Sequence, residues 1–339
     1  MLVVRPILKD DYDALHLCAE ESGHGFTSLP VNEELLTSRI DHSVNSFQKP
    51  EVTEPGDEGY LMVGVDCDTG EVAGTTGIEA SIGWDAPFYS YHISKVVHSS
   101  PKLGVNNVVK LLTFGNNYTG CSEICTLFLR PKFRGGLNGR LLSKCRFLML
   151  AEHPHRFSKT IFAEMRGVSD EKGNSPFWEW LQEHFFSIDF TMADYLTGIG
   201  KKGFIADLMP KLPIYINLLS KEAQEVIGEV HDNTRPALKL LENEGFTCRD
   251  YVDIFDAGPT VECDLRNIDT VRHSFRAQVS VAEHGSSTNY LISNTSFENF
   301  RAVAQQAAFD AETQSVILSP KVASALQVKN GDWVRMAAV

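Results

Sequence analysis

A basic, glycine-rich turn is the part of the sequence whose residues are best suited to chemistry. It follows an apolar run at 124–129 and opens a helical pattern that continues to about residue 153. Its glycines and polar residues are Arg134, Gly135, Gly136, Asn138 and Gly139. Glycines allow the backbone amides of such a turn to point inward, where they add to the positive end of the helix dipole. The segment therefore suits a pyrophosphate group.

Basic side chains lie along this turn and would add positive charge to such a site. They are Arg130, Lys132, Arg134 and Arg140. A plain connection between a strand and a helix explains the pattern as well, because glycine-rich turns are common. The turn is not a P-loop, since no Gly-Lys-Ser/Thr follows, and the acidic context of a Rossmann site is missing.

Two other residue types could take part in group transfer. A histidine such as His231 titrates near neutrality and can accept or donate a proton, although sequence alone favours a surface residue or a helix cap. Cys121 and Cys125 are possible nucleophiles. Cys125 lies in an apolar run with no neighbouring His or Lys to activate it, which would leave its thiol protonated.

Local patterns predict the elements that position these residues. Their order is strand, helix, helix, hairpin, β-rich insertion, strand, glycine-rich turn, helix and strand. The corresponding ranges are 2–5, 12–21, 32–47, 60–80, 81–121, 124–129, 130–137, 138–153 and 160–165. This alternation predicts an α/β (α+β) fold in which helices flank a mixed sheet.

The second half of the chain contains a possible internal duplication. Residues 174–186 and 234–246 each have a polar start, a proline, an amphipathic helical pattern and a final phenylalanine. Short helical segments can also match by chance, so both explanations stay open. From about residue 271, short alternating runs and an Asn330-Gly331 turn predict a small β unit. We expect three domains, at 1–170, 171–270 and 271–339.

The composition limits the possible partners and the location. Lys and Arg number 31 and Asp and Glu number 44, and the net charge of −13 argues against a nucleic-acid partner. Seven scattered cysteines form no CxxC pair, so we expect neither a metal site nor a disulfide framework. The chain shows no signal-peptide pattern and no apolar run long enough for a membrane span. We expect a cytoplasmic protein.

The turn resembles the pyrophosphate loop of the GCN5-related N-acetyltransferase superfamily. That loop has the pattern Gln/Arg-x-x-Gly-x-Gly/Ala, and the matching residues here are 134–139. The elements around the turn follow the order of that fold. In that fold, the strand before the loop offers backbone amides to pantetheine. Leu137 departs from the pattern because it stands where the superfamily has its first glycine.

The whole chain also resembles the arginine N-succinyltransferase family in six segments that occur in the same order. They are 25–30 (GFTSLP), 123–129 (EICTLFL), 163–168 (AEMRGV), 175–178 (SPFW), 222–231 (EAQEVIGEVH) and 255–260 (FDAGPT). This resemblance implies transfer of succinyl from succinyl-CoA to the α-amine of arginine, which would open an arginine-degradation pathway. Succinyl-CoA would be a co-substrate, and no permanently bound cofactor is expected. The chain departs from the family just before the first segment, at His24, where related sequences tend to have glycine.

The resemblance also implies roles for individual residues. A leucine of the family that contacts succinyl-CoA corresponds to Leu127, and the proton donor corresponds to His231. Ser28, Glu164 and Arg166 are candidates for binding the two substrates, although Glu164 and Arg166 could instead pair with each other. Alternative functions are a different acceptor such as ornithine, a shorter acyl donor, or a non-catalytic subunit that binds acyl-CoA. The family forms multimers, so we expect a homo-oligomer or a pairing with a related subunit.

Overall fold

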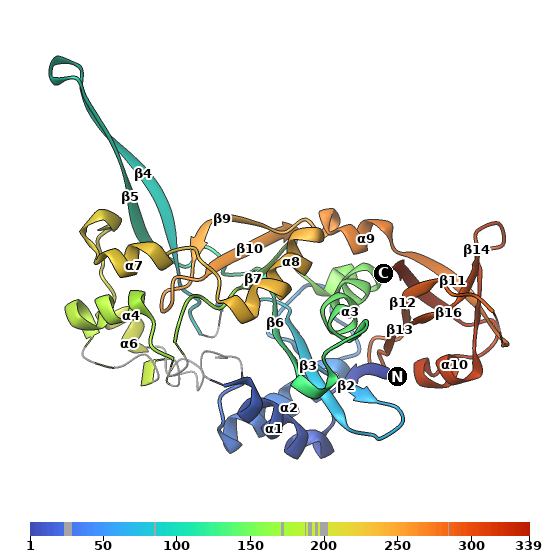
Figure 1. Ribbon diagram of the computed structural model, residues 1–339. Helices are drawn as coiled ribbons and strands as arrows, with labels where there is room; N and C mark the ends of the chain where they lie inside the picture. The colour runs from blue at the N-terminus through green and yellow to red at the C-terminus, as the bar shows by residue number, and fades with distance from the viewer. Residues whose placement is uncertain are drawn as a thin grey trace.

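The computed structural model describes residues 1–23, 29–84, 86–170, 173–186, 203–283 and 285–339, together with residues 188, 192, 193 and 196. Its strands form one continuous mixed sheet that crosses the molecule (Figure 1). Ten strands belong to the first 270 residues: β1 (Leu2–Pro6), β2 (Gly59–Asp66), β3 (Val72–Glu79), β4 (Ser90–Ser100), β5 (Val105–Gly115), β6 (Ser122–Leu129), β7 (Thr160–Glu164), β8 (Ile214–Tyr215), β9 (Thr247–Val252) and β10 (Pro259–Asp264). The expected mixed sheet with flanking helices is confirmed.

In the first 270 residues, one parallel pair of strands, β6 and β7, lies among antiparallel neighbours. β1, β2, β3 and β6 follow one another as antiparallel neighbours, and β7 then lies parallel to β6. β10 lies between β7 and β9, antiparallel to both. Residues 171–270 therefore add strands to the sheet that residues 1–170 begin. The proposed division into three domains, and the duplication, stay predictions.

Helices cover the sheet where apolar side chains recur at helical spacing. α1 (Tyr12–Ser22) and α2 (Glu33–Gln48) share a core with β2 and β3, and the Asn32 side chain caps α2 by accepting a hydrogen bond from the Leu35 N–H group. α3 (Asn138–Glu152) is buried over most of its length. The remaining helices of the first 270 residues are α4 (Pro176–Leu181), α6 (Gly203–Leu208), α7 (Lys221–Val226), α8 (Arg235–Asn243) and α9 (Asp269–His273).

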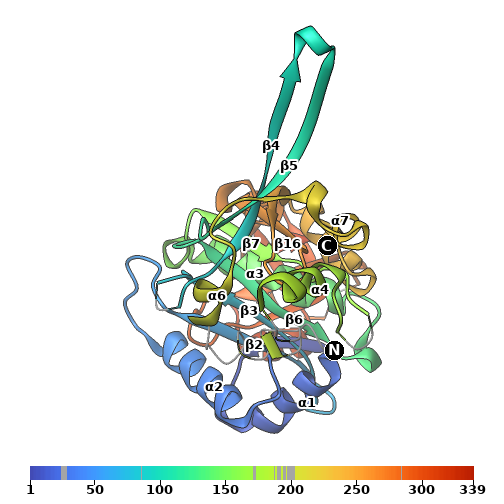
Figure 2. The same cartoon turned by 90° about the vertical axis from the view of Figure 1, so that its left-hand side faces the viewer.

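A long hairpin projects from the molecule. β4 and β5 pair along their full length, and Figures 1 and 2 show this ribbon extending well beyond the rest of the fold. Only its base joins the sheet, where Tyr91 and His92 pair with β9 and Leu111 and Leu112 pair with β8. The sequence predicts an added β region here but not its projection.

The C-terminal unit extends the same sheet through the pairing of β13 with β1. Its strands are β11 (Phe275–Val281), β12 (Asn289–Asn294), β13 (Ala302–Gln306), β14 (Ala308–Asp310), β15 (Ser315–Leu318) and β16 (Trp333–Ala338). The predicted turn is present, with Gly331 at φ +87°, but it joins a helix to β16. That helix, α10 (Pro320–Leu326), forms because Ser319 caps it and Pro320 suits its first turn.

Candidate active site

A cavity of about 570 Å³ opens where β6 and β7 separate. The two strands pair only at Ser122–Ile161 and Glu123–Phe162, although both continue beyond these positions. The side of β6 that faces β7 after Glu123 has no strand partner in the described part of the chain. Such an edge offers backbone N–H and C=O groups to an extended ligand, as an added strand would use them.

A bulge in β6 shapes this edge. Thr126 has φ +54°, and Thr126 and Leu127 together stand opposite Thr76 of β3. The Thr75 hydroxyl donates a 2.9 Å hydrogen bond to the Thr126 carbonyl oxygen, which holds the bulged backbone. Bulges redirect side chains and terminate regular pairing, and they are frequent beside active sites. Leu127, predicted to contact the acyl donor, lines the cavity at this bulge.

The glycine-rich turn closes one end of the cavity. Gly136 has φ +53°, a left-handed conformation that favours glycine, and space is open where its side chain would be. α3 then begins at Asn138, and no side chain caps its first turn. Leu137 is the N-cap residue and packs against the core, so its departure from the glycine pattern leaves the helix terminus open. An uncapped N-terminus is a suitable site for an anion.

The polar residues of the turn have different positions. Arg134 and Gly139 line the cavity, whereas Gly135, Gly136 and Asn138 lie outside its lining. The Arg134 Nε group donates to the Leu129 carbonyl at 3.1 Å, and the Asn138 side-chain amide donates to the Phe133 carbonyl at 2.9 Å. These two side chains therefore stabilise the turn itself.

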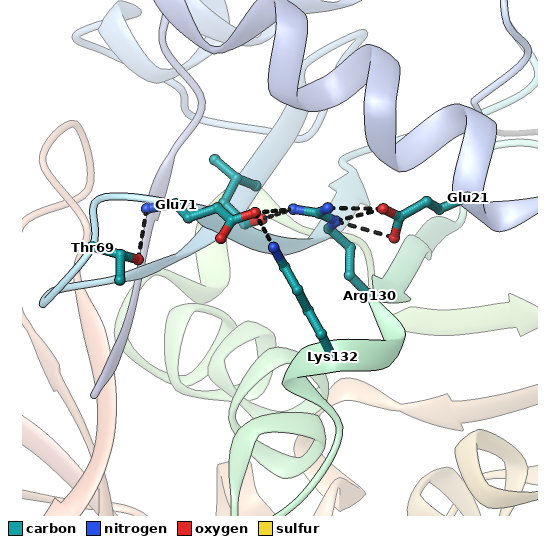
Figure 3. Close-up of polar contacts among 6 residues, drawn as sticks. Glu21, Thr69, Glu71, Arg130 and Lys132 are labelled. Carbon is teal, nitrogen blue, oxygen red and sulfur yellow. Dashed lines mark hydrogen bonds and ion pairs between the residues drawn. The ribbon is translucent and has the colours of Figure 1, made fainter.

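Two of the basic residues before the turn are already paired (Figure 3). Arg130 is 6% exposed, and its guanidinium binds the Glu21 carboxylate at 2.8 Å and the Glu71 carboxylate at 2.7 Å. Lys132 also pairs with Glu71. Their charges are therefore balanced within the protein, and the expectation that they add charge to a phosphate site is corrected. They join α1 and β3 to the start of the turn.

The opposite wall of the cavity comes from three segments that follow α3 in the sequence. Glu164, Met165 and Arg166 lie at the end of β7, Asn233 and Thr234 precede α8, and Asp253, Phe255 and Asp256 follow β9. The predicted residues Glu164 and Arg166 are thus on the wall facing Leu127. Ser28 lies outside the described residues.

A buried aspartate holds this wall together. The two carboxylate oxygens of Asp256 accept hydrogen bonds from the Gly167 N–H group at 2.7 Å and the Gly258 N–H group at 2.8 Å. A side chain at Gly258 would meet the Met165 carbonyl oxygen at 2.1 Å, so only glycine fits this crossing. Burial and the neighbouring Asp253 raise the pKa of Asp256. The clamp fixes the backbone from Met165 to Gly167.

His231 is attached to the same backbone. The backbone N–H group of His231 donates to the Arg166 carbonyl at 2.9 Å. The Nδ1 atom of its ring accepts a hydrogen bond from the Asn233 backbone N–H group at 3.1 Å. The neutral ring therefore carries its hydrogen on Nε2. The pKa of His231 is lowered mainly by partial burial and to a smaller extent by the positive charge of Arg166. His231 is not part of the cavity lining, whereas its backbone neighbours Arg166, Asn233 and Thr234 are.

The cysteines near the cavity are poor nucleophiles. Cys125 lines the cavity, and burial raises its pKa far above the usual range, while burial also raises the pKa of Cys121. A thiol that stays protonated does not attack a thioester. All seven cysteines are free. Neither thiol is therefore suited to forming a covalent intermediate.

Comparisons with known proteins agree with this architecture. The family model described as arginine N-succinyltransferase beta subunit matches residues 2–270, and the model of its C-terminal domain matches residues 275–338. The chain belongs to this family. Curated relatives named arginine N-succinyltransferase include one from Citrobacter koseri that is 45% identical over 99% of this chain and 97% of its own length. One from Escherichia coli is 44% identical with the same coverage.

A solved structure matches the fold of the whole chain. It is described as arginine/ornithine succinyltransferase subunit AI from Pseudomonas aeruginosa, has a TM-score of 0.91 and 34% identity, and covers 100% of this chain and 98% of its own. In the described part of the chain, no helix is both long enough and apolar enough to cross a membrane.

The structure adds residues that the sequence did not single out. Polar residues of this kind that line the cavity include Arg146, Asn233, Thr234, Asp253 and Asp256. For Asp256 a signal was present, since it belongs to one of the six segments that resemble the family. Arg146 gave no signal, because an arginine inside an amphipathic helical pattern usually faces solvent.

Proposed function

We propose that the chain transfers the succinyl group of succinyl-CoA to the α-amine of arginine, giving N2-succinylarginine. The observation that carries this proposal is one cavity that combines an open strand edge, an uncapped helix N-terminus and several carboxylates, in a member of this family. The cavity volume suits a ligand of the size of an acyl chain with an amino acid. The pyrophosphate would bind at the start of α3, at the end of the cavity that Arg134 and Gly139 line.

The donor would extend along β6. Its pantetheine amides would pair with the free edge after Glu123, and the thioester would lie near the bulge at Leu127. Arg134, Gly135, Gly136, Asn138 and Gly139 form the turn that would hold the pyrophosphate. Backbone amides at the bulge would polarise the thioester carbonyl, which stabilises the developing oxyanion.

The acceptor would bind against the opposite wall. A guanidinium requires a carboxylate partner, and Glu164 is the candidate we favour. Asp253 and Asp256 are less suitable, because burial raises the pKa of both and their oxygens accept backbone hydrogen bonds. Arg166 would face the α-carboxylate. Ser28 remains a further candidate for acceptor binding.

His231 would transfer the protons. The neutral amine attacks the carbonyl carbon, the new C–N bond forms, and the C–S bond breaks to release CoA. The amine loses a proton and the sulfur gains one. Because its pKa is lowered, His231 is neutral at pH 7 and can act directly or through a water molecule.

The test is turnover of succinyl-CoA with a panel of amino acids, followed by release of free thiol. His231→Ala should lower kcat by ~10²–10⁴ while the affinity for succinyl-CoA stays nearly unchanged. His231→Gln is the matched variant, because its side-chain amide can still form hydrogen bonds but cannot titrate. Unchanged turnover in both variants would refute the role of His231, and no thiol release by the wild type would refute the reaction.

Ornithine is a second candidate acceptor. The Pseudomonas aeruginosa relative is described as acting on arginine and ornithine, and both molecules carry a side-chain cation that Glu164 could bind. The same assay separates the two, since the ratio of kcat/KM for arginine and ornithine measures the preference directly. A location in the reducing cytoplasm fits the seven free cysteines.

We also propose that the β4–β5 hairpin binds a second copy of this chain. Between Ile93 and Lys110 the two strands pair only with each other, and an isolated two-stranded ribbon is marginally stable in water. Its exposed apolar side chains include Val97 (58% exposed), Leu103 (77%) and Val108 (60%). Such a ribbon would be stabilised by a surface that covers it.

The distribution of charge along the chain indicates which surface would cover the hairpin. Residues 86–122 contain three lysines and no acidic residue, so this segment carries a formal charge of +3 while the rest of the chain carries −16. A basic ribbon and an acidic body of the same protein are complementary. A related subunit, as in the family, is the other possible partner.

Light scattering after size-exclusion chromatography tests this assembly. The wild type should be larger than a monomer, and the double variant Val97→Ser/Val108→Ser should shift toward the monomer. Leu212→Ser is the matched control, because Leu212 is also an exposed apolar residue (80%) but lies outside the hairpin. A monomeric wild type would refute self-association, and a mass unaffected by the double variant would refute the role of the hairpin.

A further inference from the structure

Arg146 is an unusual residue in the middle of α3. Its side chain is only 2% exposed, and it lines the cavity. Its contacts within the protein are weak for a cation: Nε donates to the Ser143 carbonyl at 2.9 Å, Nη2 reaches the Ser143 hydroxyl at 3.4 Å, and the guanidinium lies 5.9 Å from the centre of the Phe147 ring. Among the described residues, no carboxylate lies within ion-pair distance of it.

An arginine in this position is costly to keep. Buried cations are normally paired with carboxylates, since removing a charge from water without a partner is unfavourable. Burial lowers the pKa of Arg146 to about 10, so the guanidinium still carries its charge at neutral pH. A structural role would be served equally well by an apolar side chain. The charge therefore points to an anionic ligand.

The position of Arg146 along α3 indicates which part of the ligand this is. Gly139, Leu142 and Arg146 line the cavity at helical spacing, and they form one stripe along the helix. Gly139 lies in the first turn, where the pyrophosphate would bind. Arg146 is seven residues further, which corresponds to ~10 Å along the axis. A donor that enters at Gly139 and follows β6 would bring its acyl end toward Arg146.

We propose that Arg146 binds the terminal carboxylate of the acyl group and thereby selects a dicarboxylic acyl donor over a neutral one. This inference rests on the proposed function. A guanidinium can hold a carboxylate with two parallel hydrogen bonds, and in a buried site this contact contributes both affinity and orientation. Arg166, which lies on the opposite wall, is better placed for the carboxylate of the acceptor.

The test compares succinyl-CoA with butyryl-CoA, which has the same chain length but no carboxylate. Calorimetry with the full-length protein should give at least ~30-fold tighter binding of succinyl-CoA by the wild type. In Arg146→Met this preference should fall to about one, while the affinity for free CoA stays unchanged. Arg146→Lys should give an intermediate preference, because it keeps the charge but loses the planar fork.

Cys145→Ala serves as the matched control, since Cys145 is buried on the same helix but does not line the cavity. It should keep the wild-type preference. If Arg146→Met folds, binds CoA and still prefers succinyl-CoA, the inference is wrong while the proposed function stands. If Arg146→Met instead raises the KM for arginine, Arg146 binds the acceptor and the inference is equally wrong. If the wild type releases no thiol from succinyl-CoA, the proposed function itself fails.

Discussion

Two buried arginines on the donor side of the cavity contrast sharply. Arg130, before the glycine-rich turn, binds two carboxylates and the carbonyl oxygen of Val72. Arg146, in the middle of α3, has no carboxylate partner among the described residues; its guanidinium donates to Ser143 and lies near the Phe147 ring. Both are less than one tenth exposed.

The contrast separates a structural cation from a cation that is ready for a ligand. The charge of Arg130 is satisfied inside the protein, where it connects parts of the chain that are far apart in sequence. The charge of Arg146 is unsatisfied until something enters the cavity. The role of a buried arginine therefore follows from the partners of its guanidinium and not from its burial alone. Three predictions test this distinction, from the largest expected effect to the smallest.

Arg130→Met should destabilise the protein. It leaves Glu21 without its guanidinium partner and Glu71 with Lys132 alone, and because both carboxylates are partly exposed, the loss should be ~2–4 kcal/mol. Unfolding in urea measures it. Lys132→Met is the control, since Lys132 is half exposed and should cost well under 1 kcal/mol. Equal effects of the two variants would contradict a structural role specific to Arg130.

Arg146→Met should leave the stability of the unliganded protein unchanged or raise it by ~0–2 kcal/mol. The substitution removes an unpaired buried charge and replaces it with a side chain of similar size. The same urea series gives the value. A loss as large as that of Arg130→Met would place Arg146 with the structural arginines and remove the contrast.

A third arginine extends the comparison through its effect on His231. The charge of Arg166 contributes to the lowered pKa of His231, so Arg166→Met should raise this pKa toward its ordinary value, and Arg166→Lys should not. If neutral His231 is the active form, activity falls as the pH decreases through this pKa. The acid limb of the rate profile should therefore move to higher pH in Arg166→Met. An NMR titration of the His231 ring that is the same in both variants would argue against this coupling.

Much of the donor side could be predicted from the sequence. The apolar run at 124–129, the glycine-rich turn and the helix from Asn138 are local patterns, and the structure has them as β6, the turn and α3. The hairpin of β2 and β3 and the β strands of the C-terminal unit were predicted for the same reason. Periodicity and turn residues carry this information because they act over a few neighbouring positions.

The contacts between distant parts of the chain could not be derived in the same way. Asp256 contacts Gly167 across 89 positions of sequence, and Arg130 contacts Glu21 across 109, so neither pairing leaves a local pattern. Arg146 stands beside the predicted apolar positions of α3, and only the packing of the helix between sheet and cavity shows that it is buried. The β4–β5 hairpin projects because, among the described residues, its outer part pairs with no third strand, and local sequence patterns do not show this.

The insertion of β10 between β7 and β9 has a consequence for how the protein is made. β7 is complete at Glu164, but the strand that covers its outer edge begins only at Pro259. At ribosomal rates of ~5–20 residues per second, this edge stays uncovered for roughly 5–20 s on each nascent chain. An uncovered strand next to a formed sheet is a template for pairing with another chain. Slow synthesis or crowded ribosomes should therefore affect the yield of this protein more than that of one whose sheet is completed in sequence order.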